Sequence, residues 1–167
     1  AVLGAGVMGA QIAAHLVNFK VPVVLFDLAA SPGPQASPPP EGAVKSTGEA
    51  GSTSAAKNGV VTKAIDNLKK LKPSPLGVSD DAQQIVAANY DDHLALLGEC
   101  DLVIEAIAER MDWKLDLYRR VAPALAPHAL VASNTSGLSI TRLAEALPEE
   151  IKPRFCGIHF FNPPRYM

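Results

Sequence analysis

Three glycines near the N-terminus have the spacing of a phosphate-binding turn. The segment GAGVMG, which contains Gly4, Gly6 and Gly9, follows the apolar residues AVL and precedes a helical pattern that begins at Val7. Gly4 would permit the tight turn, Gly6 the close approach of a diphosphate to the backbone, and Gly9 the close packing of helix on strand. Free N–H groups and the helix dipole favour negative charge at a helix N-terminus. The turn is therefore expected to bind the diphosphate of a dinucleotide.

A carboxylate follows this turn at a distance that suits ribose recognition. Asp27 ends the apolar run VVLF, 18 residues after Gly9. An acidic residue at this place typically accepts hydrogen bonds from the adenine-ribose hydroxyls, although a surface Asp at a strand end is the alternative interpretation. Its charge would repel a 2′-phosphate, and the next residues, LAA, bring no cation for one. NAD is therefore favoured over NADP, and no feature besides the shared glycine pattern indicates FAD.

Polar residues also follow later apolar runs. Glu109 comes after VIEAIA, Asn134 and Ser136 lie in SNTSG, and His159 begins HFFNPP. Because doubly wound sheets bind ligands at the carboxyl ends of their strands, these four side chains are expected to converge on one crevice. Each also has an ordinary alternative: His159 could cap a backbone carbonyl, Ser136 could be a turn or N-cap residue, and Glu109 could form a solvated pair with Lys114.

Strands and helices alternate along the chain in the way that a parallel sheet requires. Buried parallel strands are continuous apolar runs, and each connection between them contains a helix. The pattern predicts an α/β fold, a doubly wound, mostly parallel, Rossmann-like sheet in a single domain. The expected strands are 2–3, 21–26, 85–88, 102–107, 129–132 and 155–160, and the expected helices are 7–19, 59–71, 91–97, 112–124 and 139–146.

One segment interrupts this alternation. Residues 29–58 are rich in Pro, Gly, Ser and Ala and contain no aromatic residue, Leu or Ile. Such a sequence cannot bury enough apolar surface to offset its ordering entropy, and it is far longer than a usual connection between strand and helix. A flexible surface insertion is expected here.

Composition excludes several classes of protein. The 167 residues are 48% hydrophobic and 19% charged, which is typical of one globular domain, and the net charge of −2 gives no footprint for nucleic acid or an anionic membrane. Cys100 and Cys156 lack the spacing of a disulfide framework or a metal site. No apolar run approaches the roughly 20 residues of a membrane span, so a soluble, cytoplasmic protein is expected. Ala1 and Met167 look like cut ends of a longer protein.

Four motifs in order, GAGVMG, VIEAIAE, SNTSGLSIT and GIHFFNPP, resemble the L-3-hydroxyacyl-CoA dehydrogenase family. The resemblance covers almost the whole chain outside 29–58, and it implies the NAD-binding domain, residues 1–167, of an enzyme that oxidises L-3-hydroxyacyl-CoA to 3-ketoacyl-CoA in fatty-acid β-oxidation. The wording HFFNPPRYM is similar to the form fused to an enoyl-CoA hydratase in bacterial multifunctional proteins. The resemblance also implies a homodimeric parent protein.

The same resemblance implies roles for individual residues. His159 would be the catalytic base, with Ser136 and Asn134 near the substrate oxygen, and a neutral imidazole can take up a hydroxyl proton near physiological pH. Glu109 and Lys114 match positions that line the cofactor site. Basic residues of the expected helix 59–71 and just after it would help to hold coenzyme A, although a solvated helix face is the alternative; they are Lys63, Lys69, Lys70 and Lys72.

The chain departs from the family at its C-terminal end. The family pairs its histidine with a Glu that follows HFFNPP, and it adds a helical C-terminal domain for the acyl chain and the dimer contacts; neither lies within these residues. Loss of such a carboxylate costs orders of magnitude in rate, so this chain alone is expected to bind NAD weakly and to turn over little. A non-catalytic nucleotide-binding module, or a dehydrogenase of another 3-hydroxy acid, is the alternative function.

Overall fold

The structure is a computed structural model that describes residues 1–30 and 57–167. A six-stranded parallel sheet forms its centre. The strand order is β3-β2-β1-β4-β5-β6, and every neighbouring pair is parallel. The chain reverses its direction of winding between β1 and β4, which is the point where doubly wound sheets bind ligands. The strands are β1 (Val2–Leu3), β2 (Val23–Asp27), β3 (Ile85–Asn89), β4 (Leu102–Glu105), β5 (Leu130–Ser133) and β6 (Phe155–Gly157).

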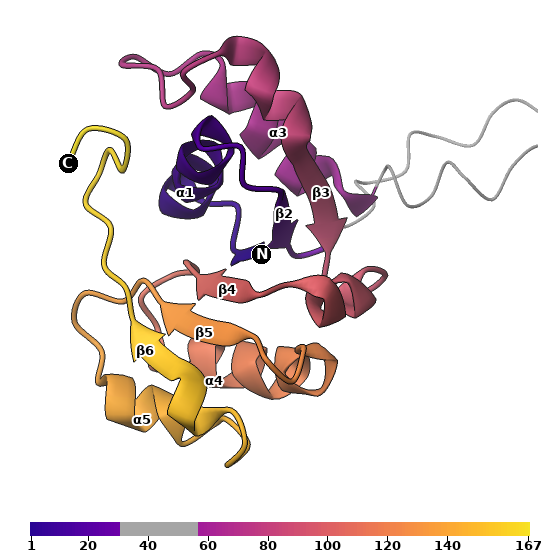
Figure 1. Ribbon diagram of the computed structural model, residues 1–167, viewed down its shortest axis with the longest axis vertical. Helices are drawn as coiled ribbons and strands as arrows, with labels where there is room; N and C mark the ends of the chain where they lie inside the picture. The colour runs from indigo at the N-terminus through magenta and orange to yellow at the C-terminus, as the bar shows by residue number, and fades with distance from the viewer. Residues whose placement is uncertain (31–56) are drawn as a thin grey trace, which may run out of the picture.

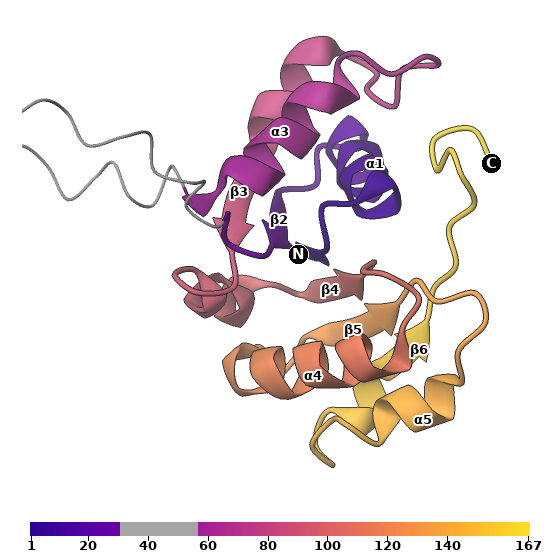
Figure 2. The ribbon, with the colours of Figure 1, turned by 180° about the vertical axis from the view of Figure 1, so that it is seen from behind.

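Helices cover both faces of this sheet. Helices α1 and α3 pack together on one face, and α4 and α5 lie on the other (Figures 1 and 2). The α-helices among the described residues are α1 (Val7–Asn18), α3 (Gly59–Leu68), α4 (Met111–Val121) and α5 (Ile140–Ala144). Short 3-10 helices are η1 (Ser79–Gln84), η2 (Leu94–Glu99), η3 (Ala122–Ala124) and η4 (Lys152–Arg154). The expected doubly wound α/β fold is confirmed.

Successive residues of the central strands point into two different cores. Val2 and Leu25 pack with the apolar side of α1, whereas their neighbours Leu3 and Phe26 pack with Leu117 of α4. This alternation follows from the two-residue period of a strand. Because both faces are covered, the strands are mostly apolar and carry their polar residues at their carboxyl ends, where the sheet serves as a platform for them.

Several sequence-based boundaries differ from the structure, and for three of them a side chain or a proline gives the local reason. The strand expected over 155–160 ends at Gly157, because the N–H of Phe160 donates to Asn134 Oδ1 (2.8 Å) instead of continuing the ladder. The helix expected over 91–97 is the 3-10 helix η2, preceded by a turn in which Asn89 Oδ1 accepts from two backbone N–H groups. Helix α3 ends at Leu68, shortly before Pro73 and Pro75.

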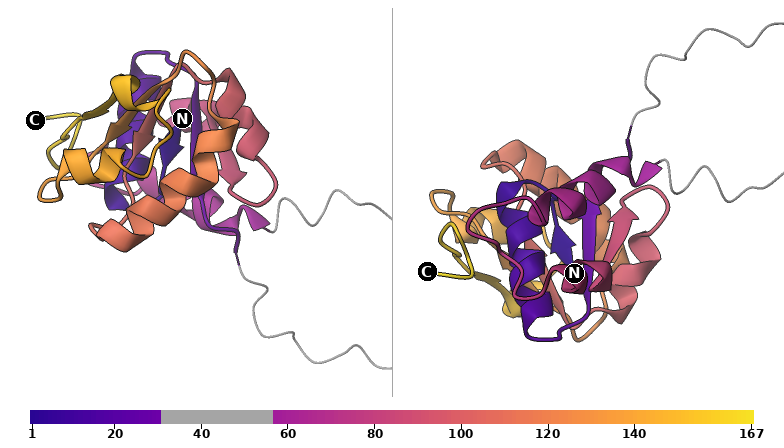
Figure 3. Two further views of the ribbon diagram at one scale, coloured as in Figure 1. Left: turned by 90° about the horizontal axis from the view of Figure 1, so that it is seen from below. Right: turned by 90° about the horizontal axis from the view of Figure 1, so that it is seen from above.

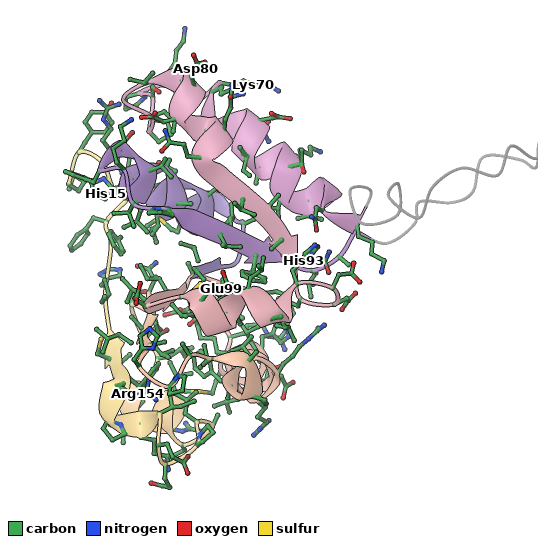
Figure 4. The ribbon with its side chains drawn as sticks, turned by 45° about the vertical axis from the view of Figure 1, so that its right-hand side comes forward. His15, Lys70, Asp80, His93, Glu99 and Arg154 are labelled. Carbon is green, nitrogen blue, oxygen red and sulfur yellow. The ribbon has the colours of Figure 1, made fainter. Side chains whose placement is uncertain are left out.

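The insertion predicted at 29–58 lies almost wholly outside the described residues. Its described flanks meet, because the N–H of Ala30 donates to the carbonyl of Lys57 over 2.8 Å. The lysines assigned to the expected helix 59–71 and the residues just after it need a correction. Of these four, only Lys63 is on α3. Lys70 lies at the periphery of the fold (Figure 4).

After β6 the chain leaves the sheet and runs past α1 (Figures 1 and 2), ending at the margin of the fold in both views of Figure 3. Side-chain hydrogen bonds hold its last residues. Arg165 donates to the carbonyls of Ser74 and Leu76, and the Tyr166 hydroxyl donates to Ser74 O over 2.8 Å. The C-terminal segment is thereby fastened to the connection that follows α3.

Candidate functional site

The glycine turn has the geometry that its sequence predicts. Gly4 has φ +103°, and a Cβ there would lie 2.9 Å from the carbonyl oxygen of Ala106. A Cβ on Gly9 would lie 1.8 Å from Gly4 O, so only glycine lets α1 pack this closely on β1. A Cβ on Gly6 would meet nothing within 4 Å. The backbone at Gly6 is therefore open to a ligand.

Helix α1 begins at this open turn. Gly6 is the N-cap residue, no side chain caps the helix, and its first turn carries no acidic residue. The N–H groups at the start of a helix have no intrahelical partner, and together with the helix dipole they favour an anion. The turn and the helix end thus provide backbone donors for a phosphate group.

Asp27 is fixed by the turn that it faces. Its Oδ2 accepts from the N–H of Ala5 (2.6 Å), and its Oδ1 accepts from the N–H of Leu28 (2.7 Å). Each carboxylate oxygen keeps further acceptor capacity. The carboxylate therefore both ties β2 to the glycine turn and remains available to hydroxyl groups of a ligand.

A cavity of about 430 Å³ opens beside Asp27, at the carboxyl ends of β1, β2 and β4. The residues around its mouth come from four parts of the chain, among them Gly4, Gly6 and Leu28. Its remaining wall belongs to α4, which the motifs did not indicate as a lining element. The residues from α4 are Trp113, Asp116, Leu117 and Arg120. Their i, i+3, i+4, i+7 spacing is a helical stripe that the sequence displays.

A buried charged cluster lies under the next strand ends. Glu105 and Lys114 have side chains 0% and 1% exposed, and Lys114 Nζ lies 2.6 Å from Glu105 Oε1. The carboxylate also accepts from the hydroxyls of Tyr118 (2.9 Å) and Ser133 (2.6 Å). Burial, followed by the negative charge of Glu105, raises the pKa of Tyr118. The solvated-pair interpretation of Lys114 is thus wrong, and Glu105 is a supporting residue that sequence reasoning missed.

Glu109 binds the turn that contains Ser136. Its Oε1 accepts from Thr135 Oγ1 (2.6 Å) and from the N–H groups of Ser136 and Gly137 (2.8 Å each). Burial favours the neutral acid, but these hydrogen bonds and the charge of Lys114 outweigh it and lower the pKa of Glu109 to about 2. The expected proximity of Glu109 and Ser136 is confirmed.

His159 lies on the segment that leaves the sheet after β6. Its imidazole is exposed and meets the ring of Phe161 edge to face, with 4.9 Å between ring centroids. Two residues that follow His159 are held by side chains. The N–H of Phe160 donates to Asn134, and Asn162 Oδ1 accepts from Gln11 Nε2 over 3.2 Å. His159 is thus presented on a segment that side chains fasten to two other elements.

The underside of this segment packs against α1. His15 lies on the side of α1 that faces the segment (Figure 4), and its ring centroid is 6.4 Å from that of Phe160. The Nδ1 atom of His15 is buried without a hydrogen-bond partner. Aromatic packing, in addition to the hydrogen bonds, therefore positions this part of the chain.

A second hollow of about 360 Å³ lies between α1 and α3. It is lined by Gly6 and Val7 at the start of α1, by Gln11, and by Lys63 and Asn67 of α3. It therefore borders both the glycine turn and the residue that holds Asn162. Lys69, Lys70 and Lys72 do not line it.

Other kinds of site leave no trace in the described parts of the chain. Within 1–30 and 57–167 no group of three or more His, Cys, Asp or Glu side chains could hold a metal ion, and Cys100 and Cys156 are free thiols. None of the helices described is both long and apolar enough to cross a bilayer.

Comparison with known proteins matches the whole chain to one protein family. The family model described as 3-hydroxyacyl-CoA dehydrogenase, NAD binding domain, matches residues 1–167. A fatty acid oxidation complex trifunctional enzyme named in Rickettsia felis is 42% identical over 166 residues, which are 99% of this chain and 20% of that protein. A 3-hydroxyacyl-CoA dehydrogenase named in Deinococcus radiodurans is 35% identical over 167 residues, covering 100% of this chain and 42% of its own length.

Solved structures agree with this fold. The 3-hydroxybutyryl-CoA dehydrogenase from Escherichia coli K12 superposes with a TM-score of 0.69 at 27% identity, over 99% of this chain and 30% of that one. The chain thus spans about a fifth to two fifths of the length of these three proteins.

Proposed function

The chain belongs to the 3-hydroxyacyl-CoA dehydrogenase family as its NAD-binding domain, and from this premise we propose that the full-length protein oxidises L-3-hydroxyacyl-CoA to 3-ketoacyl-CoA. The observation that carries the proposal is an assembly at one edge of the sheet. The glycine turn and Asp27 lie there beside an open cavity, and Glu109 and Asn134 gather the Ser136 turn and the His159 segment at neighbouring strand ends. Fold alone would not carry it, because this fold serves many functions.

The residues of the first half fit NAD. Gly6 leaves the backbone open, Gly4 and Gly9 hold a turn that a Cβ would break, and α1 offers uncapped N–H groups to a diphosphate. Asp27 is set beside the cavity to accept hydrogen bonds from the adenine-ribose hydroxyls. These four residues are the proposed cofactor-binding group. The same negative charge disfavours the 2′-phosphate of NADP.

The residues of the second half fit the oxidation of an alcohol group. NAD held by the first half would supply a hydride acceptor for C3 of the substrate, and residues of the second half would take up the hydroxyl proton. His159 is the proposed base, because its imidazole is exposed and imidazole is the side chain most often used as a general base. Ser136 can hydrogen-bond the same oxygen. Asn134 uses its Oδ1 on Phe160 and keeps its amide N–H groups for the substrate.

Glu109 and Lys114 support the nicotinamide end in different ways. Glu109 is 42% exposed and can meet a ligand directly while it holds the Ser136 turn. Lys114 is 1% exposed and lies between Glu105 (2.6 Å) and Glu109 (3.6 Å), so it acts as a positioning residue through these carboxylates. Glu109 is therefore the proposed cofactor contact, and Lys114 is its proposed support.

An acyl-CoA thioester is the proposed substrate, with Lys63 as the cation on α3 that borders the second hollow. A free 3-hydroxy acid would need a cation for its carboxylate beside SNTSG or HFFNPP, and Arg165, the nearest in sequence, is engaged with backbone carbonyls. Residues 1–167 are the proposed NAD-binding domain of a larger protein. A homodimeric parent, fusion to an enoyl-CoA hydratase and a cytoplasmic location remain predictions.

The test is an assay of the full-length protein with NAD and an L-3-hydroxyacyl-CoA, following NADH absorbance. We expect turnover with the L isomer, and His159→Gln should lower kcat roughly 10²- to 10⁴-fold while leaving NADH affinity unchanged. Ser136→Ala should lower it less. A full-length protein that binds NADH but oxidises no 3-hydroxyacyl-CoA would favour the non-catalytic nucleotide-binding module.

A further inference from the structure

The wall of the cofactor cavity that α4 forms has no role in the assignments above. Four residues of one helical stripe line it, and two of them, Trp113 and Leu117, are apolar or aromatic. Leu28 lines the same cavity from the end of β2. Trp113 and Leu28 are 51% and 63% exposed, although side chains of this size are usually covered. Two large apolar side chains are thus exposed to solvent in the same cavity.

Trp113 is held in place by a neighbouring ion pair. The guanidinium carbon of Arg110 lies 4.5 Å from the centroid of the indole ring. Arg110 is itself held by Asp112, to which its Nε and Nη2 donate over 3.1 and 2.6 Å. A guanidinium on one face of an indole stacks favourably and restricts the ring. The indole is therefore ordered before any ligand arrives, which lowers the entropic cost of binding.

The floor of the same region carries a second set of fixed groups. The Tyr90 ring stacks on Phe26 (5.8 Å between centroids, 16° between planes), and the Arg120 guanidinium lies 5.7 Å from the Tyr90 centroid. Asp91 neutralises Arg120 in an ion pair of 2.5 Å. Arg120, the cation in the lining of this cavity, is thus already paired, and the Tyr90 ring and the apolar residues remain as its flat surfaces.

We propose that Trp113 and Leu28 form the adenine clamp of the cofactor site, with the base lying between the indole and the leucine side chain. This inference rests on the assignment of the cavity to NAD. If Asp27 binds the adenine ribose, the base attached to that ribose must lie next to it, and Leu28 is the next residue of the chain. A flat heteroaromatic ring is the ligand group that suits an ordered indole on one side and a leucine on the other.

The clamp is tested by calorimetric titration of the purified chain with NADH and with ADP-ribose, which lacks the nicotinamide. Trp113→Ala should weaken both ligands by the same factor, roughly tenfold or more, because loss of a stacking platform has this size. Trp113→Phe should recover most of the affinity. Since Trp113 is the single tryptophan of the sequence, ADP-ribose should also quench the intrinsic indole fluorescence of the unmodified chain.

A matched pair of leucines provides the control. Leu28→Ala should weaken ADP-ribose, whereas Leu130→Ala, which removes a leucine 53% exposed outside the cavity, should not. Far-ultraviolet circular dichroism melts identify any variant that fails to fold. Unchanged ADP-ribose affinity in folded Trp113→Ala, with NADH still bound, overturns the clamp and leaves the NAD assignment standing. If the full-length protein, titrated in the same way, binds neither ligand, the NAD assignment fails and the clamp fails with it.

Discussion

The two ends of the site are built in different ways. At the adenosine end, adjacent parallel strands place the ligand groups: β1 pairs with β2 at Leu3 and Phe26, and the N–H of Gly4 donates to Phe26 O over 2.8 Å. Asp27 then binds the turn directly. At the His159 end, the groups lie on loops and on a segment beyond the sheet, held by the side chains of Glu109, Asn134, Gln11 and Arg165.

This difference separates geometry set by the backbone from geometry set by buried polar contacts. A sheet ladder keeps its spacing when one side chain changes, whereas a loop held by a few hydrogen bonds loses its place when a partner is removed. Replacing a supporting side chain at the adenosine end should therefore cost little unfolding free energy. Replacing one at the His159 end should cost more. Four experiments can break or sharpen this contrast.

The largest effect is expected from Glu105→Ala. It leaves the Lys114 ammonium, 1% exposed, without its 2.6 Å partner and takes an acceptor from Tyr118 and Ser133. Removing one partner of a buried pair costs about 3–5 kcal/mol of unfolding free energy. Urea denaturation measures this. Replacing both partners, Glu105→Leu with Lys114→Met, should recover most of the loss, and a single variant that loses under about 1 kcal/mol would contradict the contrast.

Asp27→Ala should instead reduce binding more than stability. The N–H groups of Ala5 and Leu28 lose a charged acceptor, and the proposed ribose contact is lost as well. Hydrogen bonds to a charged group of this kind correspond to roughly a 10- to 100-fold loss in NADH affinity, together with the preference over NADPH. Calorimetric titration measures both ligands. Asp66→Ala, an exposed change on α3, is the control and should leave the two affinities as they are.

Glu109 predicts a pH dependence at the His159 end. Its folded pKa is depressed from the usual 4.5 to about 2, so the stability it contributes is present above pH 4.5 and is lost as the pH falls toward 2. With the side chain 42% exposed, solvent screening reduces this contribution to about 1 kcal/mol. Thermal melts across this range should fall more steeply for the unmodified chain than for Glu109→Gln. Glu149→Gln, 85% exposed, should melt in parallel with the unmodified chain.

The smallest effect is expected from Arg165→Ala. Its guanidinium fastens the C-terminal segment to the carbonyls of Ser74 and Leu76, and loss of these partly exposed hydrogen bonds costs about 0.5 kcal/mol. Faster amide exchange should appear in residues 158–166 while the sheet stays protected. Arg142→Ala, an exposed arginine on α5, is the matched control. Equal exchange in both variants would show that the aromatic packing on His15 suffices.

The sequence predicted the adenosine end better than the His159 end for the same physical reason. The glycine turn, the Asp27 position and the parallel sheet follow from local patterns, because they depend on the periodicity of strands and on φ values that favour glycine. Glu105 was missed, because nothing in the sequence indicates that this carboxylate in an apolar strand pairs with Lys114. The two residues meet only when α4 packs on the sheet. The end of β6 at Gly157 was equally invisible, because it depends on Asn134, 26 residues before Phe160.

The two adjacent faces of α4 have a consequence for engineering. Trp113 and Leu117 face the cavity, while their immediate neighbours Lys114 and Tyr118 enter the buried cluster. Consecutive residues of a helix are about 100° apart, so a one-residue insertion or deletion before Trp113 would exchange the two faces. Point substitutions at Trp113, Asp116 and Arg120 leave the buried face intact, whereas Leu117 also packs in the core. Cofactor preference can therefore be redesigned on this helix independently of folding, provided that its length is kept.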